Sequence, residues 1–143
     1  MVATDGSEDS LAAVRAVAGR VWPEFSEFRV VAVMDARMET AIAWPESVAA
    51  QWAREQDSVS GEALVRMLEH SAKILSDAGL AVETQLLKGD PKHELLTQAE
   101  AWEADAIFIG ARGLHHGGRL ALGTMASAVA ARAHCSVEIV RPG

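Results

Sequence analysis

The sequence feature that most constrains the fold is a glycine-spaced loop between a strand-like apolar run and a helix of small residues. The loop spans 110–124 and reads GARGLHHGGRLALGT, after AIFI and before MASAVAARA. Gly110 and Gly113 allow a positive φ and a close approach of the backbone to a bound group. Gly123 and Thr124 stand where the helix should begin, and Thr124 suits the N-cap or first turn. Because such a helix end attracts anions, the loop predicts a phosphate site.

The charges around this loop differ in sign from those of the whole chain. The chain has a formal net charge of −7, yet residues 106–137 contain no Asp or Glu. The basic and titratable residues of that window are Arg112, Arg119, Arg132, His115, His116 and His134. A cationic loop on an anionic protein favours a negatively charged ligand. The alternative stays open that this is a solvent-exposed loop that only leads into the helix and binds no ligand.

Length and composition indicate one domain, residues 1–143, with enough chain to bury a core. No apolar run approaches a membrane span, and the start shows no secretory signal. Cys135 is the only cysteine, which excludes an intrachain disulfide and a cysteine zinc motif. These features fit a cytoplasmic protein. The acidic balance argues against nucleic acid as a partner.

Strand-like apolar runs alternate along the chain with helical patterns. The expected strands are 1–5, 28–34, 80–87, 104–109 and 136–140. The expected helices are 7–21, 47–78, 91–103 and the segment after Thr124, with Asp90 and Pro91 as a strong start signal for the third. This alternation implies a parallel sheet with helices on both faces and right-handed crossovers. The first strand is short, so the sequence leaves open whether residues precede Met1.

Three chemically informative segments follow the carboxyl ends of expected strands: Asp5, residues 33–35, and Gly110 onward. Ligands of such sheets bind beyond these ends, where the strand order reverses. The segments converge on one crevice if the first and fourth strands are neighbours. Asp5 could contact a ribose or adenine edge, or help to hold a metal on phosphates. It could instead cap the N–H of Ser7 or Glu8 within the turn.

The basic side chains of the loop and the cysteine after its helix could have a functional role or an ordinary structural one. Arg112 and Arg119 could pair with phosphate or could be ordinary surface charges. His115 and His116 are sequence neighbours that do not share a face, so no metal site is expected from them. Cys135 is expected to be a structural residue, because a buried lone cysteine behaves as a small hydrophobe.

Together these segments resemble the universal stress protein family. The loop fits that family's nucleotide motif G-x2-G-x9-G-(S/T) at the four fixed positions Gly110, Gly113, Gly123 and Thr124. The opening ATDGSEDS is similar to the family's first strand and turn, and HCSVEIVRP to its closing strand. GDPKHELLTQAEAWEADAIFIGARG is similar to its third helix and fourth strand. The resemblance covers essentially the whole chain.

The resemblance implies a Rossmann-like α/β fold, an open five-stranded parallel sheet in the order 3-2-1-4-5 with helices on both faces. It implies a homodimer through the C-terminal strand. It also implies ATP, with or without Mg²⁺, as the ligand, because members with the loop motif bind ATP and a branch without it does not. By position, the implied nucleotide-binding residues are Ala3, Thr4, Asp5, Val33, Ile109, Gly110, Arg112, Gly113, Gly123, Thr124 and Met125.

The sequence shows no catalytic constellation. No Ser–His–acid arrangement can be placed, no Walker lysine follows the glycine loop, and no general base can be assigned beside the phosphates. The expectation is therefore a cytoplasmic, dimeric, ATP-binding module of the stress response, which signals through ligand-dependent shape or partner binding. Two alternatives stay open: a slow Mg²⁺-dependent ATP hydrolase and a nucleotide-free dimeric scaffold of the same fold.

Overall fold

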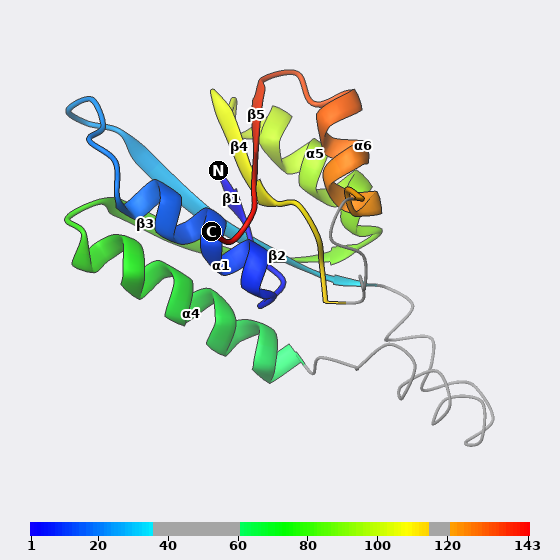
Figure 1. Ribbon diagram of the computed structural model, residues 1–143, viewed down its shortest axis with the longest axis horizontal. Coiled ribbons are helices and arrows are strands. Elements are labelled where there is room, and N and C mark those ends of the chain that lie inside the picture. Colours follow the sequence, from blue (N-terminus) through cyan, green and yellow to red (C-terminus); the bar gives the residue numbers. More distant parts are fainter. Residues whose placement is uncertain (36–60, 115–120) are drawn as a thin grey trace.

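A central sheet with helices on both faces makes up residues 1–35, 61–114 and 121–143, which the computed structural model describes (Figure 1). The strands are β1 (Val2–Ala3), β2 (Glu27–Asp35), β3 (Ala81–Gly89), β4 (Ala106–Gly110) and β5 (Ser136–Val140). The helices are α1 (Glu8–Ala18), α4 (Gly61–Asp77), α5 (Pro91–Ala101) and α6 (Thr124–Arg132). No helix within these ranges is long and apolar enough to cross a membrane.

The strands are parallel and lie in the order β3-β2-β1-β4-β5, which confirms the expected topology. Val2 of β1 is aligned with Val30 of β2 on one side and with Phe108 of β4 on the other. The chain moves outward from β1 to β3 and then returns to the other side of β1 for β4 and β5. The strand order therefore reverses between β1 and β4, where open α/β sheets bind ligands.

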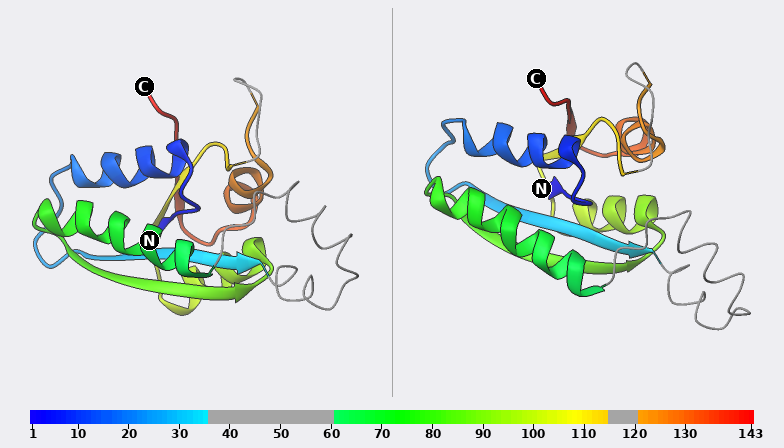
Figure 2. Two further views of the ribbon diagram at one scale, coloured as in Figure 1. Left: turned by 90° about the horizontal axis from the view of Figure 1, so that it is seen from below. Right: turned by 60° about the horizontal axis from the view of Figure 1, so that its bottom comes forward.

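The core lies in two apolar layers, one on each face of the sheet. The layer under α1 and α4 includes Val2, Val14, Val17, Val30, Leu68, Leu75 and Phe108. The layer under α5 and α6 includes Ala3, Val31, Leu95, Ile107, Ile109 and Val129. Figure 2 shows the helices and the sheet from two further directions. Because side chains alternate along a strand, the apolar run in β2 serves both layers, with Val30 and Ala32 on one face and Val31 on the other.

Most element ends fall within a few residues of the predicted ones. The first helix ends at Ala18, earlier than expected, because Gly19 caps it by donating to the Arg15 oxygen at 2.9 Å. The third expected helix ends at Ala101, and Glu103 beyond it takes a left-handed φ of 51°. The second expected helix is confirmed over α4, and its first part, 47–60, lies outside the described residues.

Candidate functional site

The carboxyl ends of β1, β2 and β4 meet at one edge of the sheet, as the sequence predicts. Thr4 follows β1 and donates its N–H to the Val31 oxygen of β2 at 2.9 Å. Gly110 ends β4 on the other side of β1. Gly123 joins this edge from further along the chain, because its N–H donates to the Ala111 oxygen at 2.7 Å. The predicted site residues of the first, second and fourth strands and of α6 thus lie at the same edge. Arg119, His115 and His116 lie outside the described residues.

The turn after β1 is held by its own side chains. The Asp5 Oδ1 accepts the Ser7 N–H at 2.9 Å, which is the local capping role that the sequence left open as an alternative. Ser7 is the N-cap of α1 and accepts the Ser10 N–H on its Oγ at 3.2 Å. Gly6 has a φ of 81°, and a Cβ there would lie 2.4 Å from the Met67 Sδ of α4. The turn is therefore tight, and α4 packs directly against it.

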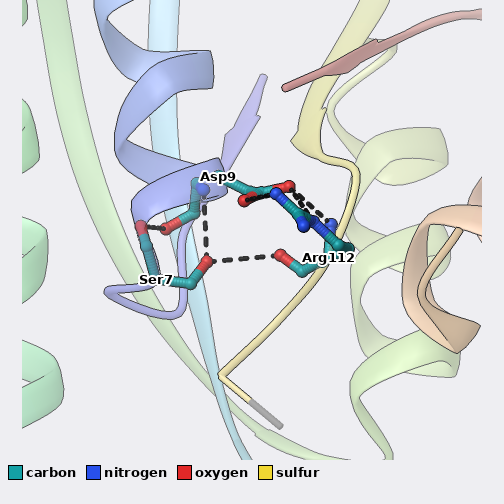
Figure 3. A network of polar contacts seen from close by, with 4 residues as sticks. Ser7, Asp9 and Arg112 are labelled. Carbon is teal, nitrogen blue, oxygen red and sulfur yellow. Dashed lines mark hydrogen bonds and ion pairs between the residues drawn. The ribbon is translucent and has the colours of Figure 1, made fainter. Parts of the chain in front are cut away.

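An ion pair between the buried carboxylate of Asp9 and the partly exposed side chain of Arg112 joins the start of α1 to the loop after β4 (Figure 3). Arg112 donates from Nε to the Asp9 Oδ2 at 3.0 Å and from Nη2 to the Asp9 Oδ1 at 3.0 Å. The main-chain N–H of Arg112 also donates to the Asp9 Oδ2 at 3.1 Å. Ser7 adds a longer contact, from its Oγ to the Arg112 carbonyl oxygen at 3.4 Å. The hydrogen bonds to Asp9 raise the pKa of Arg112 above its ordinary value.

This pair is the functional-site feature that sequence reasoning missed. In the sequence, Asp9 is a candidate cap at the start of the first expected helix, and its partner lies 103 positions away. Arg112 was expected to face phosphate, and here its side chain runs toward α1, away from α6 (Figure 3). The sequence offers only an acid near the start of a helix and an arginine in a distant loop, which does not specify a pair.

The glycines of the loop are needed for different close contacts. A Cβ on Gly110 would lie 2.5 Å from the Asp9 carbonyl carbon and 2.6 Å from the Ser10 nitrogen, so this glycine lets β4 touch the backbone of α1. A Cβ on Gly113 would lie 2.8 Å from the Asp5 Oδ2. Neither glycine adopts a positive φ, so the conformational freedom that the sequence offered there is not used. Close approach is the property that both positions require.

The start of α6 presents main-chain N–H groups at this edge. Gly123 is the N-cap, and no side chain of the described residues caps the helix there. Thr124, the first helical residue, is exposed, and Met125 is half-buried against the α5–α6 layer. The first N–H groups of a helix have no partner within the helix, and together with the helix dipole they favour an anion. These are the N–H groups on which the anion site predicted from the loop depends.

The described residues also include the side chains that bear on metal binding and thiol reactivity. Within the described residues, no group of three or more His, Cys, Asp or Glu side chains could hold a metal ion. Cys135 precedes β5 at the opposite end of the strands, and burial raises the pKa of its thiol. A raised pKa keeps the sulfur protonated, and the thiolate is the reactive form.

Solved structures with the same fold include several that hold an adenine nucleotide. The structure of hypothetical protein MJ0577 matches with a TM-score of 0.77 at 24% identity, over 99% of this chain and 94% of that one. A universal stress protein in complex with cAMP is 25% identical, with a TM-score of 0.62, over 98% of this chain and 93% of that one. An Arabidopsis thaliana family member with AMP bound is 16% identical, with a TM-score of 0.66, over 100% and 90%. An Archaeoglobus fulgidus universal stress protein in complex with dAMP is 19% identical, with a TM-score of 0.58, over 97% and 94%.

Proteins of similar sequence are universal stress proteins, as are several of the structures with this fold. The chain is 28% identical over 141 residues to universal stress protein MJ0531 of Methanocaldococcus jannaschii, a match that covers 99% of this chain and 80% of the relative. It is 29% identical over 147 residues to universal stress protein YxiE of Bacillus subtilis, with 99% and 97% covered. The sequence profile of the universal stress protein family matches residues 1–141. The chain therefore belongs to the universal stress protein family.

Proposed function

We propose that this chain binds an adenine nucleotide, and ATP in particular, at the edge of the sheet between β1 and β4. The observation that carries the proposal is the meeting of the β1 turn, the β4 loop and the start of α6 at the point where the strand order reverses. The 25%-identical relative in complex with cAMP supports an adenine nucleotide as the class of ligand. The loop motif supports assignment to the ATP-binding branch.

In this proposal, the segments that meet at the edge of the sheet contact different parts of the nucleotide. Ala3, Thr4 and Asp5 line the adenosine side, and Val33 meets the adenine. Ile109, Gly110, Arg112 and Gly113 hold ribose and phosphates. Residues 123–125 close over the phosphates. Since Asp9 engages both the main-chain N–H and the guanidinium of Arg112, the phosphates depend chiefly on the N–H groups of α6.

The direct test of this proposal is the identity of any nucleotide that leaves the purified protein on denaturation. We expect mass spectrometry to detect an adenine nucleotide, and calorimetry on the stripped protein to show binding of ATP at one site per chain. Titration with GTP is the matched control for the base. A protein that releases no nucleotide and gives no binding heat with ATP, AMP or cAMP would contradict the proposal and favour the nucleotide-free scaffold.

We further propose that the protein acts in the cytoplasm as a homodimer that signals by ligand-dependent partner binding. β5 forms an edge of the described sheet, and an edge strand can pair with a second copy across a two-fold axis. Ile139→Lys is expected to raise the monomer fraction in analytical ultracentrifugation, because it places a charge at that strand.

Ile139 also packs against the layer under α5 and α6, so its loss has a cost within one chain. Ile139→Ala removes the same packing without adding charge and is the matched control. It should dissociate less than Ile139→Lys at equal protein concentration. A wild type that sediments as a monomer at high concentration would contradict the dimer.

Turnover of bound ATP is expected to be well below the roughly 1–100 s⁻¹ of kinases. Backbone N–H groups that hold phosphate stabilise the ground state and the transition state alike, which does not accelerate the chemical step. The carboxylates nearest the loop have structural partners, since Asp5 accepts from Ser7 and Asp9 pairs with Arg112. The measurement is phosphate released per site from Mg²⁺-ATP. Sustained release of about one per second or faster, lost in Asp5→Asn or Thr124→Ala, would identify an enzyme instead.

A further inference from the structure

We infer that Asp9 is a positioning residue for the phosphate side of this site and that it acts through Arg112. The inference rests on the proposed function and adds a residue that does not itself touch the ligand. The basis of the inference is that the Asp9 carboxylate on α1 accepts three hydrogen bonds from Arg112. Two come from the guanidinium and one comes from the main-chain N–H.

Burial makes this pair a firm anchor. Asp9 is 5% exposed, and an ionised carboxylate at that depth is costly unless it is paired and hydrogen-bonded. The two parallel bonds to the guanidinium fix its plane as well as its distance. The third bond fixes the main chain of the loop itself. Movement of Arg112 away from α1 would leave the Asp9 charge buried and unpaired.

The anchored residue stands next to the groups that meet the ligand. Gly113 follows Arg112 directly, and the preceding Ala111 accepts the N–H of Gly123 at 2.7 Å. A Cβ on Gly123 would lie 3.4 Å from the Arg112 Cα, so the start of α6 packs on the anchored loop. The position of Arg112 therefore sets the relation between the loop and the first N–H groups of α6. Holding this arrangement before the ligand arrives lowers the ordering cost of binding.

The pair can be broken with little change of shape by Asp9→Asn. We expect this variant to bind AMP about tenfold more weakly, because loss of preorganisation raises the cost of binding the phosphate. Its affinity for adenosine, which has no phosphate, should stay within about twofold of wild type. Glu8→Gln is the matched control, since Glu8 is exposed on the same turn of α1 and its removal also deletes one negative charge.

Two further variants separate positioning from simple support of the fold. In an Arg112→Gln background, Asp9→Asn should weaken AMP binding less than it does in the wild type, because the route through the guanidinium is gone and only the main-chain bond to Asp9 remains. Arg112→Lys keeps the charge but cannot form the two parallel bonds, and it should also weaken AMP selectively. This variant tests the inference if Asp9→Asn does not fold.

The AMP and adenosine titrations distinguish a positioning role of Asp9 from a purely structural one. Equal losses for AMP and adenosine would reduce Asp9 to a structural role and overturn the inference, as would unchanged AMP binding. Tighter AMP binding by Asp9→Asn would also overturn it, because Asp9 would then be withholding Arg112 from the phosphate. A wild type that binds neither adenosine nor AMP would overturn the proposed function itself, together with the inference that rests on it.

Discussion

Gly110→Ala is expected to destabilise the protein by about 3 kcal/mol, since overpacking a close contact typically costs 1–3 kcal/mol and here nothing flexible can yield. The added methyl would lie 2.5 Å from the Asp9 carbonyl carbon and 2.6 Å from the Ser10 nitrogen, and both atoms belong to the backbone of α1. Relief requires α1 to move away from β4, which opens the layer that contains Val14 and Phe108. For a chain of this size, the loss corresponds to a fall of about 10 °C in melting temperature.

Thermal unfolding followed by circular dichroism measures this effect. Gly19→Ala is the matched control, because a Cβ at that position would make only an ordinary contact, 3.4 Å from the Arg15 oxygen. The control should melt close to wild type. A melting temperature of Gly110→Ala within about 2 °C of wild type would show that β4 and α1 do not touch as closely as the structure has them.

Gly113→Val is expected to weaken ATP binding by about 100-fold, or ~2.7 kcal/mol, in a protein that stays folded. A Cβ there would lie 2.8 Å from the Asp5 Oδ2, so the added side chain displaces the end of a side chain and not the backbone. It also fills the space in which the proposed phosphate approaches the loop. The expected result is loss of binding with a nearly unchanged circular dichroism spectrum.

Calorimetry with ATP on the nucleotide-free protein measures the loss. Asp5→Asn is an informative companion, because it keeps the size of the side chain that Gly113→Val displaces and removes only its charge. If Asp5→Asn binds normally and Gly113→Val does not, the loss comes from blocked space near the loop. Normal affinity in Gly113→Val would contradict the assignment of the phosphates to this loop.

Gly110 and Gly113 show how far a motif can be interpreted from sequence. As sequence positions they look equivalent, and both were expected to serve a ligand through close backbone approach. The structure separates them, because Gly110 faces the backbone of α1 and Gly113 faces the side chain of Asp5. A substitution at Gly110 therefore reports on stability, and one at Gly113 is the better test of binding.

The sequence by itself determined the fold class, because buried apolar runs alternate with helical patterns and only a parallel sheet with helices on both faces satisfies that order. The order 3-2-1-4-5 came from the resemblance of particular segments to a family, since alternation alone permits other orders. Local signals also placed element starts well, and the Asp90 cap accepts the His93 N–H as its spacing predicts.

The tertiary structure decided what the side chains at the site do. The pairing of Asp9 with Arg112, the contact of Gly110 with α1 and the packing of Met67 under Gly6 all join segments far apart in the chain. Periodicity and turn chemistry are local, so they carry no record of which distant groups will meet. Burial then gives these contacts their strength, because a charge or a backbone atom that has left water must find its partner within the fold.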